Sequence, residues 1–329
     1  MNPSVALQTN GAAPETSARQ EQPITEASQP NETLYLTGRP TLKRFLRFVR
    51  QEALKAPHEA ALIAEWQAAK ERVSRLEKDE PGAADNVPTR PVPVDAKYEP
   101  LLTEFLKDPL VQNGFNTVPT EVAFVELDRL VVYQKHIDLT FVRELKKKLG
   151  PTPTDEEIFR TCLPYDHPQP PARWSRLNDG SFVFVSPSCD MRFLKAMPLE
   201  ARHIKGYPQP GAVVGVVGLA VGFGSNFLNA LCAENRLILN NGSHRAYALR
   251  DMGFTHVPCV VQHVSTRDEL DVVAASAIRN DPNTYLKHPR PSMLKDYFNP
   301  ELRKIIPVHR KVRQITVKFQ VEEIYVPAV

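Results

Sequence analysis

The sequence has few cysteines, no long apolar run and no strong excess of either charge. Its four cysteines are widely spaced in 329 residues and form no C-x-x-C pair, so neither a zinc site nor a disulfide framework is expected. No stretch approaches the roughly 20 apolar residues of a membrane-spanning helix, and no basic-then-apolar signal peptide is visible. A net charge of +3 is too small to indicate nucleic acid. We therefore expect a reduced, cytoplasmic protein with no membrane contact and no metal-ligand cluster.

Composition divides the chain into five parts. An apolar middle is flanked by segments that are polar or proline-rich, and 42% hydrophobic residues can support a sizeable core. The predicted parts are a disordered tail (1–38), a helical hairpin (39–79), a proline-rich linker (80–100), a central domain (101–265), and a C-terminal helix and strand packed on it (266–329).

The hairpin is predicted from two amphipathic stretches, Thr41–Leu54 and Pro57–Lys78. Packing on the central domain is the favoured interpretation, because amphipathic stripes usually face a core. Dimerisation or docking of a partner is the alternative. The first stretch also carries a basic cluster, which indicates a solvated face, with a nucleic-acid contact as the alternative. That cluster is Lys43, Arg44, Arg47 and Arg50.

The most informative stretch reads as strand, glycine turn, helix and strand. Arg236–Leu239 is a short apolar run, and Asn240-Asn241-Gly242 is a turn. Ser243 is placed to cap a helix that ends near Gly253, and Val257–Val261 has the composition of a second strand.

This turn has the chemistry of an anion site. Gly242 permits a sharp turn, and the N–H groups of the following first helical turn attract phosphate or carboxylate. His244 and Arg245 add up to two positive groups, and an arginine can clamp a phosphate with two parallel hydrogen bonds. In the alternative interpretation Ser243 only caps the helix, Arg245 pairs with a carboxylate such as Asp251, and His244 is an ordinary loop residue.

At these residues the chain resembles the ParB/sulfiredoxin-like superfamily. The pattern N-G-S-H-R-x-x-A-L-x-x-x-G, followed by V-P-C-V-V, is similar to the turn that binds nucleotide phosphates in that family. A second segment resembles the family's first strand, loop and helix: Val125–Val132, then Gln134-Lys135, then Asp138–Leu149. The resemblance implies an α+β fold, with a mixed sheet covered by helices, over at most Glu121–Gln262.

The resemblance also implies ligands. Bound ATP or CTP with Mg²⁺, or another phosphorylated small molecule, would contact Gly242–Arg245, and Lys135 and Lys148 could also reach a phosphate. The helix bearing Lys148 carries Phe141 and Glu144 where the family has small hydroxyls. Ser243 stands where sulfiredoxins have their catalytic cysteine, and a hydroxyl cannot perform that thiolate chemistry.

The expected sheet combines five strands, and Gly211–Gly224 is interpreted as a buried strand that pairs with Arg236–Leu239 rather than as a nucleotide loop. The strands are Val122–Val132, Phe182–Val185, Val213–Val221, Arg236–Leu239 and Val257–Val261. A single helix, Thr266–Arg279, and a final strand, Val312–Val326, are expected beyond them.

Three function classes follow. The first is a nucleotide-dependent phosphotransferase or hydrolase, whose catalytic candidates are Ser243, Glu126 and Asp128, with Asp190 as a further carboxylate. The second is a ParB-like DNA-associated protein, although no second recognition helix follows the motif. The third is a non-catalytic scaffold that binds a partner through its helical hairpin.

Overall fold

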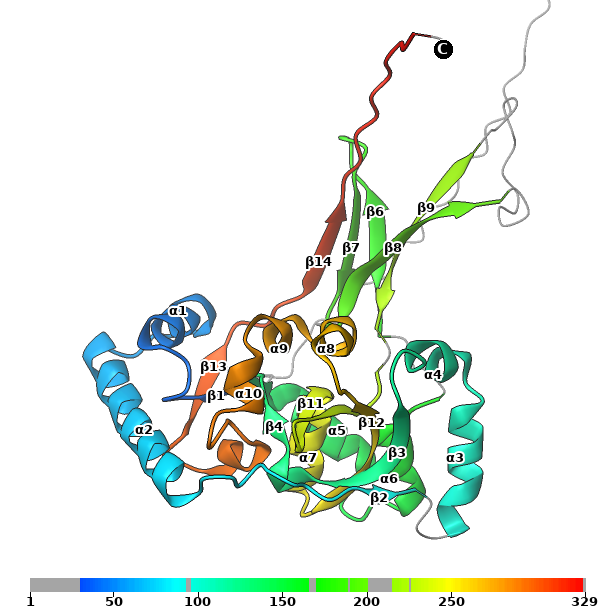
Figure 1. Cartoon of the computed structure of the whole chain (residues 1–329). Coiled ribbons are helices and arrows are strands. Elements are labelled where there is room, and N and C mark those ends of the chain that lie inside the picture. The colour runs from blue at the N-terminus through cyan, green and yellow to red at the C-terminus, as the bar shows by residue number, and fades with distance from the viewer. Residues whose placement is uncertain are drawn as a thin grey trace, which may run out of the picture.

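The computed structural model describes residues 30–92, 96–165, 170–188, 190–200, 215–224 and 226–327. These residues form a mixed α+β structure in which most elements pack into one body and five strands project from it (Figure 1). The α+β prediction is therefore confirmed. No helix among the described residues is long and apolar enough to cross a membrane.

The body is built on a six-stranded mixed sheet. β12 lies at its centre, antiparallel to β3 and parallel to β10, and β11 is antiparallel to β10 and parallel to β4. The strand order is β2 (Arg90–Pro91), β3 (Thr120–Glu126), β12 (His256–His263), β10 (Asn229–Ala233), β11 (Arg236–Asn241) and β4 (Val131–Val132). Arg236–Leu239 and Val257–Val261 thus lie in one sheet, as predicted.

The hairpin partner of β11 differs from the prediction. It is β10, and the two strands are joined by Glu234 and Asn235, which both have positive φ angles of 48° and 62°. Two such residues form the primed turn that matches the twist of antiparallel strands. The segment NALCA was missed because it has no β-branched residue, although the Glu-Asn pair before RLIL was a usable turn signal.

Helices cover the sheet and fill the ends of the body. The main core joins α5 and α7 to the central strands through a continuous apolar cluster that includes Val142, Leu239, Leu249 and Val257. Besides the two helices of the N-terminal hairpin, the described helices, including short 3-10 turns, are η1 (Ala96–Tyr98), α3 (Glu99–Leu106), α4 (Pro109–Gly114), η2 (Leu127–Arg129), α5 (Leu139–Leu149), α6 (Asp155–Cys162), α7 (Ser243–Asp251), α8 (Arg267–Val273), α9 (Ser276–Asn280), α10 (Pro282–Leu286) and η4 (Leu294–Phe298).

The predicted helix Thr266–Arg279 is broken into α8 and α9. The break comes at Ala274 and Ala275, where the backbone is extended. The N–H of Ala275 donates to Oδ1 of Asn240, 2.9 Å away, and Nδ2 of Asn240 donates to the carbonyl oxygen of Val273. A side chain at the end of β11 therefore satisfies the backbone groups that a continuous helix would have used.

A second sheet corrects the predicted N-terminal tail. Its order is β13 (Arg303–Val308), β1 (Asn31–Leu36) and β5 (His136–Asp138), so residues predicted to be disordered form its central strand. Leu34 is 0% exposed. Only residues 1–29 of the predicted tail lie outside the described residues. Composition failed here because a short apolar segment, TLYL, follows a polar one and is paired by strands far away in sequence.

The predicted helical hairpin is present as α1 (Leu42–Glu52) and α2 (Glu59–Asp79). Its apolar residues Phe45, Val49 and Leu62 form a cluster with Tyr35 of β1 and Ile306 of β13. This agrees with packing on the main body, and it occupies the apolar stripe that the dimerisation alternative would have used. The proline-rich segment that follows is not a free tether, since Ala84 and Val92 are buried and β2 joins the main sheet.

Two small sheets project from the body (Figure 1). One has the order β14 (Arg313–Val317), β7 (Phe182–Ser186) and β6 (Arg173–Arg176), and the other pairs β8 (Met191–Leu199) with β9 (Val216–Phe223). Phe182–Val185 and Val216–Val221 are therefore strands, but neither belongs to the main sheet. β9 is also only partly buried, contrary to the prediction, and residues 211–214 lie outside the described residues.

The C-terminal extension is likewise only partly as predicted. The strand expected over Val312–Val326 is limited to Arg313–Val317, because β7 is short and offers no partner beyond Phe182. Residues 318–327 are largely exposed and have no regular structure. β13 packs on the body, whereas β14 belongs to the projecting part (Figure 1).

Candidate functional site

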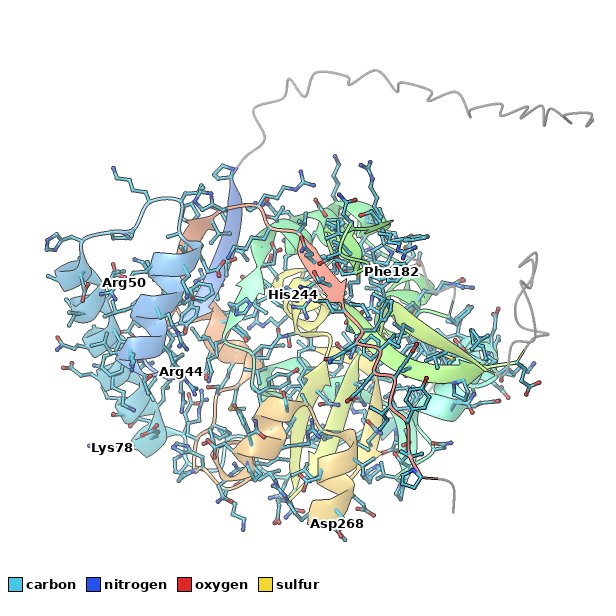
Figure 2. All side chains as sticks on the ribbon, turned by 90° about the horizontal axis from the view of Figure 1, so that it is seen from above. Arg44, Arg50, Lys78, Phe182, His244 and Asp268 are labelled. Atoms are coloured by element: carbon cyan, nitrogen blue, oxygen red, sulfur yellow. The ribbon has the colours of Figure 1, made fainter. Side chains whose placement is uncertain are left out.

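The predicted anion turn lies where two helices begin side by side. In the first turns of the two helices, the rings of Phe141 in α5 and His244 in α7 have centroids 5.6 Å apart. In their last turns, the ammonium group of Lys146 in α5 pairs with the carboxylate of Asp251 in α7. The two helices therefore run parallel, with their N-terminal ends together. Figure 2 looks down on this end, with His244 near the centre of the view.

The two N-termini differ in how they are capped. Oδ1 of Asp138 accepts hydrogen bonds from the N–H groups of Thr140 and Phe141, at 2.8 and 3.1 Å, so α5 is capped. α7 has Gly242 at its N-cap, with φ of +93°, and no side chain in the described residues caps it. The prediction that Ser243 is the cap is wrong, since Ser243 is the first helical residue. Within the described part of the chain, the first-turn N–H groups of α7 thus remain available for a ligand.

Gly242 is required for packing as well as for its backbone angle. A β-carbon at this position would stand 2.5 Å from Cδ1 of Leu228, which is fully buried. Gly253, at the other end of α7, has a similar φ of +95° but open space where its β-carbon would be. The two glycines therefore allow the steric cost to be separated from the cost of the backbone angle.

We expect Gly253→Ala to lower the free energy of unfolding by about 1–2 kcal/mol, because an L-residue is strained in the left-handed region. Gly242→Ala should cost about 1–3 kcal/mol more, since the added methyl group overlaps Leu228. Urea denaturation of both variants measures the difference. Equal losses would mean that Leu228 moves aside without cost.

Arg245 has a different role from the predicted phosphate clamp. It is only 5% exposed, and its Nη1 donates to the carbonyl oxygens of Thr161, at 3.1 Å, Cys162 and Asn226. It therefore anchors the C-terminal end of α6 under the turn, where a cation is favoured. Its Nη2 is buried against Gly242 and has no hydrogen-bond partner among the described residues. Nor does Arg245 pair with Asp251, as the alternative interpretation had it, because Asp251 pairs with Lys146.

His244 does not add a positive charge at neutral pH. Its pKa is lowered to about 4, mainly by burial and also by the charges of His136 and Arg245, which outweigh the opposing charge of Asp138. The imidazole is thus neutral near pH 7, and the site's positive potential comes from the helix terminus and Arg245. A neutral histidine can still donate or accept a hydrogen bond at the turn.

The depressed pKa makes stability depend on pH. Below pH 6.5 the unfolded chain protonates His244 while the folded chain does not, so the folded state is progressively destabilised as pH falls from 6.5 toward 4. We expect His244→Gln to lose less stability than the wild type over that interval. Thermal unfolding at half-unit pH steps measures this, and parallel curves for the two proteins would contradict it.

Lys135 lies in the segment between β4 and β5, next to His136, whose charge acts on His244. Burial lowers the pKa of its ammonium group, and so does the positive charge of Arg44 on α1, while Asp281 raises it. The backbone carbonyl of Lys135 accepts a hydrogen bond from Leu36, and His136 follows it in β5. In Figure 2, Arg44 lies between α1 and the body. The sequence had indicated a solvated face for Arg44, with a nucleic-acid contact as the alternative.

Three other candidates lie at the wrong end of α7. Asp128 forms a two-point ion pair with Arg250, at 2.9 and 3.1 Å, and Glu126 is paired in register with His256, just after the helix ends. Arg250 is seven residues from Ser243, which is roughly 10 Å along a helix. Lys148 is exposed beyond Lys146, near the C-terminal end of α5. The structure therefore does not bring Glu126, Asp128 or Lys148 to the turn.

Asp190 is the acidic candidate whose charge environment includes the turn. Its pKa is raised by partial burial, and the charges of Arg192 and Arg245 counter that rise. Its carboxylate accepts a hydrogen bond from Arg192, 3.0 Å away.

Ser243 is buried, at 4% exposure, so its hydroxyl is not presented to solvent as a nucleophile would be. Tyr133, which donates to the carbonyl of Asn240 beside the turn, was not found from the sequence, because nothing in its neighbourhood marked it.

Comparison with known proteins adds no family to this description. No protein-family model, curated protein or solved structure matches the chain. The assignment of function therefore depends on the geometry of the turn and its surroundings.

Proposed function

We propose that this protein has a ParB/sulfiredoxin-like central domain and binds a nucleotide, or another phosphate-bearing small molecule, at the N-terminus of α7. The observation that carries the proposal is the contrast between the two parallel helices. Asp138 caps α5, whereas Gly242 leaves the first turn of α7 uncapped. An uncapped helix N-terminus after a positive-φ glycine attracts phosphate oxygens.

Positive charge around the turn supports an anionic ligand. Arg245 lies buried beneath the turn, and among the described residues its hydrogen bonds all go to uncharged backbone carbonyls, while the carboxylate of Asp190 is a nearby charge. In a buried site its charge is weakly screened, so it favours an anion above it without touching that anion. Lys135 is the cation that we assign to direct contact with phosphate, and Arg44 adds to the positive field.

The reaction that suits this arrangement is transfer or hydrolysis of a phosphoryl group. Bound Mg²⁺ would neutralise phosphate charge, and such a complex needs only one or two protein carboxylates. We assign that role to Asp190, because Glu126 and Asp128 lie at the far end of α7. Ser243 in place of cysteine argues against a sulfiredoxin activity.

Calorimetric titration with ATP, CTP and pyrophosphate, each with and without Mg²⁺, tests the proposal. Lys135→Ala is expected to weaken binding about tenfold or more, since a hydrogen bond to a charged group contributes roughly 1.5–3 kcal/mol. Lys148→Ala removes the same charge from the far end of α5 and is the matched control, with unchanged affinity expected. If none of these ligands binds the wild type, the non-catalytic scaffold becomes the favoured function. If Lys135→Ala and Lys148→Ala lose the same affinity, the ligand does not bind at the α7 turn.

A further inference from the structure

The projecting strands carry a second surface that the α7 turn does not explain. β14, β7 and β6 form a small sheet that stands away from the body (Figure 1). Its register pairs Phe184 with both Trp174 and Ile315, and Phe182 with both Arg176 and Val317. Residues directly opposite each other in a sheet share a face, so these six side chains form one surface.

Aromatic rings on this face stack in a row. Trp174 and Phe184 have centroids 6.4 Å apart at an interplanar angle of 28°, and Phe182 and Phe319 have centroids 6.5 Å apart at 26°. Trp174 is 67% exposed and Phe319 60% exposed. Burial of such rings normally contributes to stability, so a row that is left this exposed suits contact with another molecule.

The same surface is flanked by arginines without carboxylate partners. Arg176 lies opposite Phe182, and Arg313 lies opposite Ser186, which is on the same face as Phe184. Among the described residues, neither arginine forms an ion pair or a side-chain hydrogen bond, and the same holds for Arg173 and Arg310 nearby. The aromatic row is thus bordered by free positive charge on both outer strands.

We propose that this face of β14, β7 and β6 binds single-stranded nucleic acid, with bases stacked on Trp174 and Phe319 and phosphates beside Arg176 and Arg313. Exposed rings bind bases of any sequence, and arginines beside them follow the phosphate backbone. A duplex hides the faces of its bases, so it could use only the charges. A second copy of this chain would bring the same unpaired arginines to the face, and like charges oppose that contact.

Fluorescence anisotropy with a labelled 20-nucleotide oligo(dT) tests this proposal on the full chain. We expect Trp174→Ala and Phe319→Ala each to weaken binding about tenfold, and Trp174→Phe to restore most of the loss, because it keeps a ring for stacking. The double variant Arg176→Gln/Arg313→Gln should reduce the slope of log affinity against log salt by about 1.4. The charge-matched control Lys147→Gln/Lys148→Gln, on α5, should leave affinity and slope unchanged.

Trp174 also provides a direct signal. The chain has two tryptophans. The other one, Trp66, lies in α2, where its indole N–H donates to the carbonyl oxygen of Pro40. Quenching of the exposed tryptophan by the strand is expected in Trp66→Phe and absent in Trp174→Phe. The proposal is overturned if the oligonucleotide does not bind, or if the aromatic variants bind it as tightly as the wild type does. If the oligonucleotide does not bind and light scattering shows a dimer that Trp174→Ala dissociates, the face is instead a contact between two copies of the chain.

Discussion

Deletion of residues 1–37 is expected to abolish cooperative folding or lower the melting temperature severely. The deletion removes β1, the central strand between β13 and β5, and with it the ladder hydrogen bonds of both neighbours. It also removes Tyr35 from the cluster that holds α1 and α2 on the body. Circular dichroism during heating measures the loss.

Two comparisons make this prediction specific. Deletion of residues 1–29 leaves β1 intact, and its polar composition predicts little change in melting temperature. Within β1, Leu34→Ala should cost about 2–5 kcal/mol, because it creates a cavity in the core. Glu32→Ala breaks only the half-exposed pair with Arg143 and should cost at most about 1 kcal/mol. An unchanged melting temperature after deletion of residues 1–37 would show that β1 is dispensable.

The other large effect is expected at a buried charge network. Arg290 and Asp296 are 1% and 2% exposed and form two hydrogen bonds of 3.0 and 2.6 Å. Arg290 also pairs with Glu80 at the end of α2, and its carbonyl accepts a hydrogen bond from Arg39, which follows β1. The network therefore ties the N-terminal hairpin to the segment after α10.

Asp296→Ala should lower the free energy of unfolding by about 3–5 kcal/mol, because it leaves the Arg290 guanidinium buried without its main partner. The double variant Arg290→Met/Asp296→Leu should lose less than the single variant, since no uncompensated charge remains. Urea denaturation measures both. The control is Glu301→Ala, which removes a largely exposed carboxylate that pairs with Arg72 and Arg75 and is expected to cost at most about 1 kcal/mol. A loss as small in Asp296→Ala as in the control would show that water or a neighbouring group compensates.

The helices and the turn of the α7 region could be predicted because their signals are local. The sequence indicated a turn at Gly242 and a helix end near Gly253, and these two glycines bracket α7. The caps of α5 and α6 are Asp138 and Thr154, which are residue types that favour this position. Each of these depends on residues within one helical turn of each other. The strand order around β11 was harder to predict from the sequence, because β10 has weak strand propensity and its register depends on β12.

The roles of the site residues depended on neighbours that sequence spacing does not reveal. A glycine followed by histidine and arginine predicts an anion clamp, but the arginine was turned inward by the carbonyls of Thr161, Cys162 and Asn226. The two carboxylate candidates Glu126 and Asp128 were separated from the turn by the length of α7. Lys135 is next to His136, whose charge acts on His244, whereas Lys148 lies at the far end of α5.

By itself the sequence determined the α+β class, the amphipathic hairpin and the glycine turn that opens α7, because composition, periodicity and caps act over short distances. Only the tertiary structure decided that β1 is a central strand, that Arg245 is an internal anchor, and that β6, β7 and β14 project from the body. The two strand outcomes depend on pairing between segments more than 100 residues apart, as between β1 and β13 or β7 and β14, and the anchoring by Arg245 depends on carbonyls as far as 84 residues away. Which strands pair, and which side chains become buried, depends on the distant segment that each one contacts, and a local sequence pattern does not identify that segment.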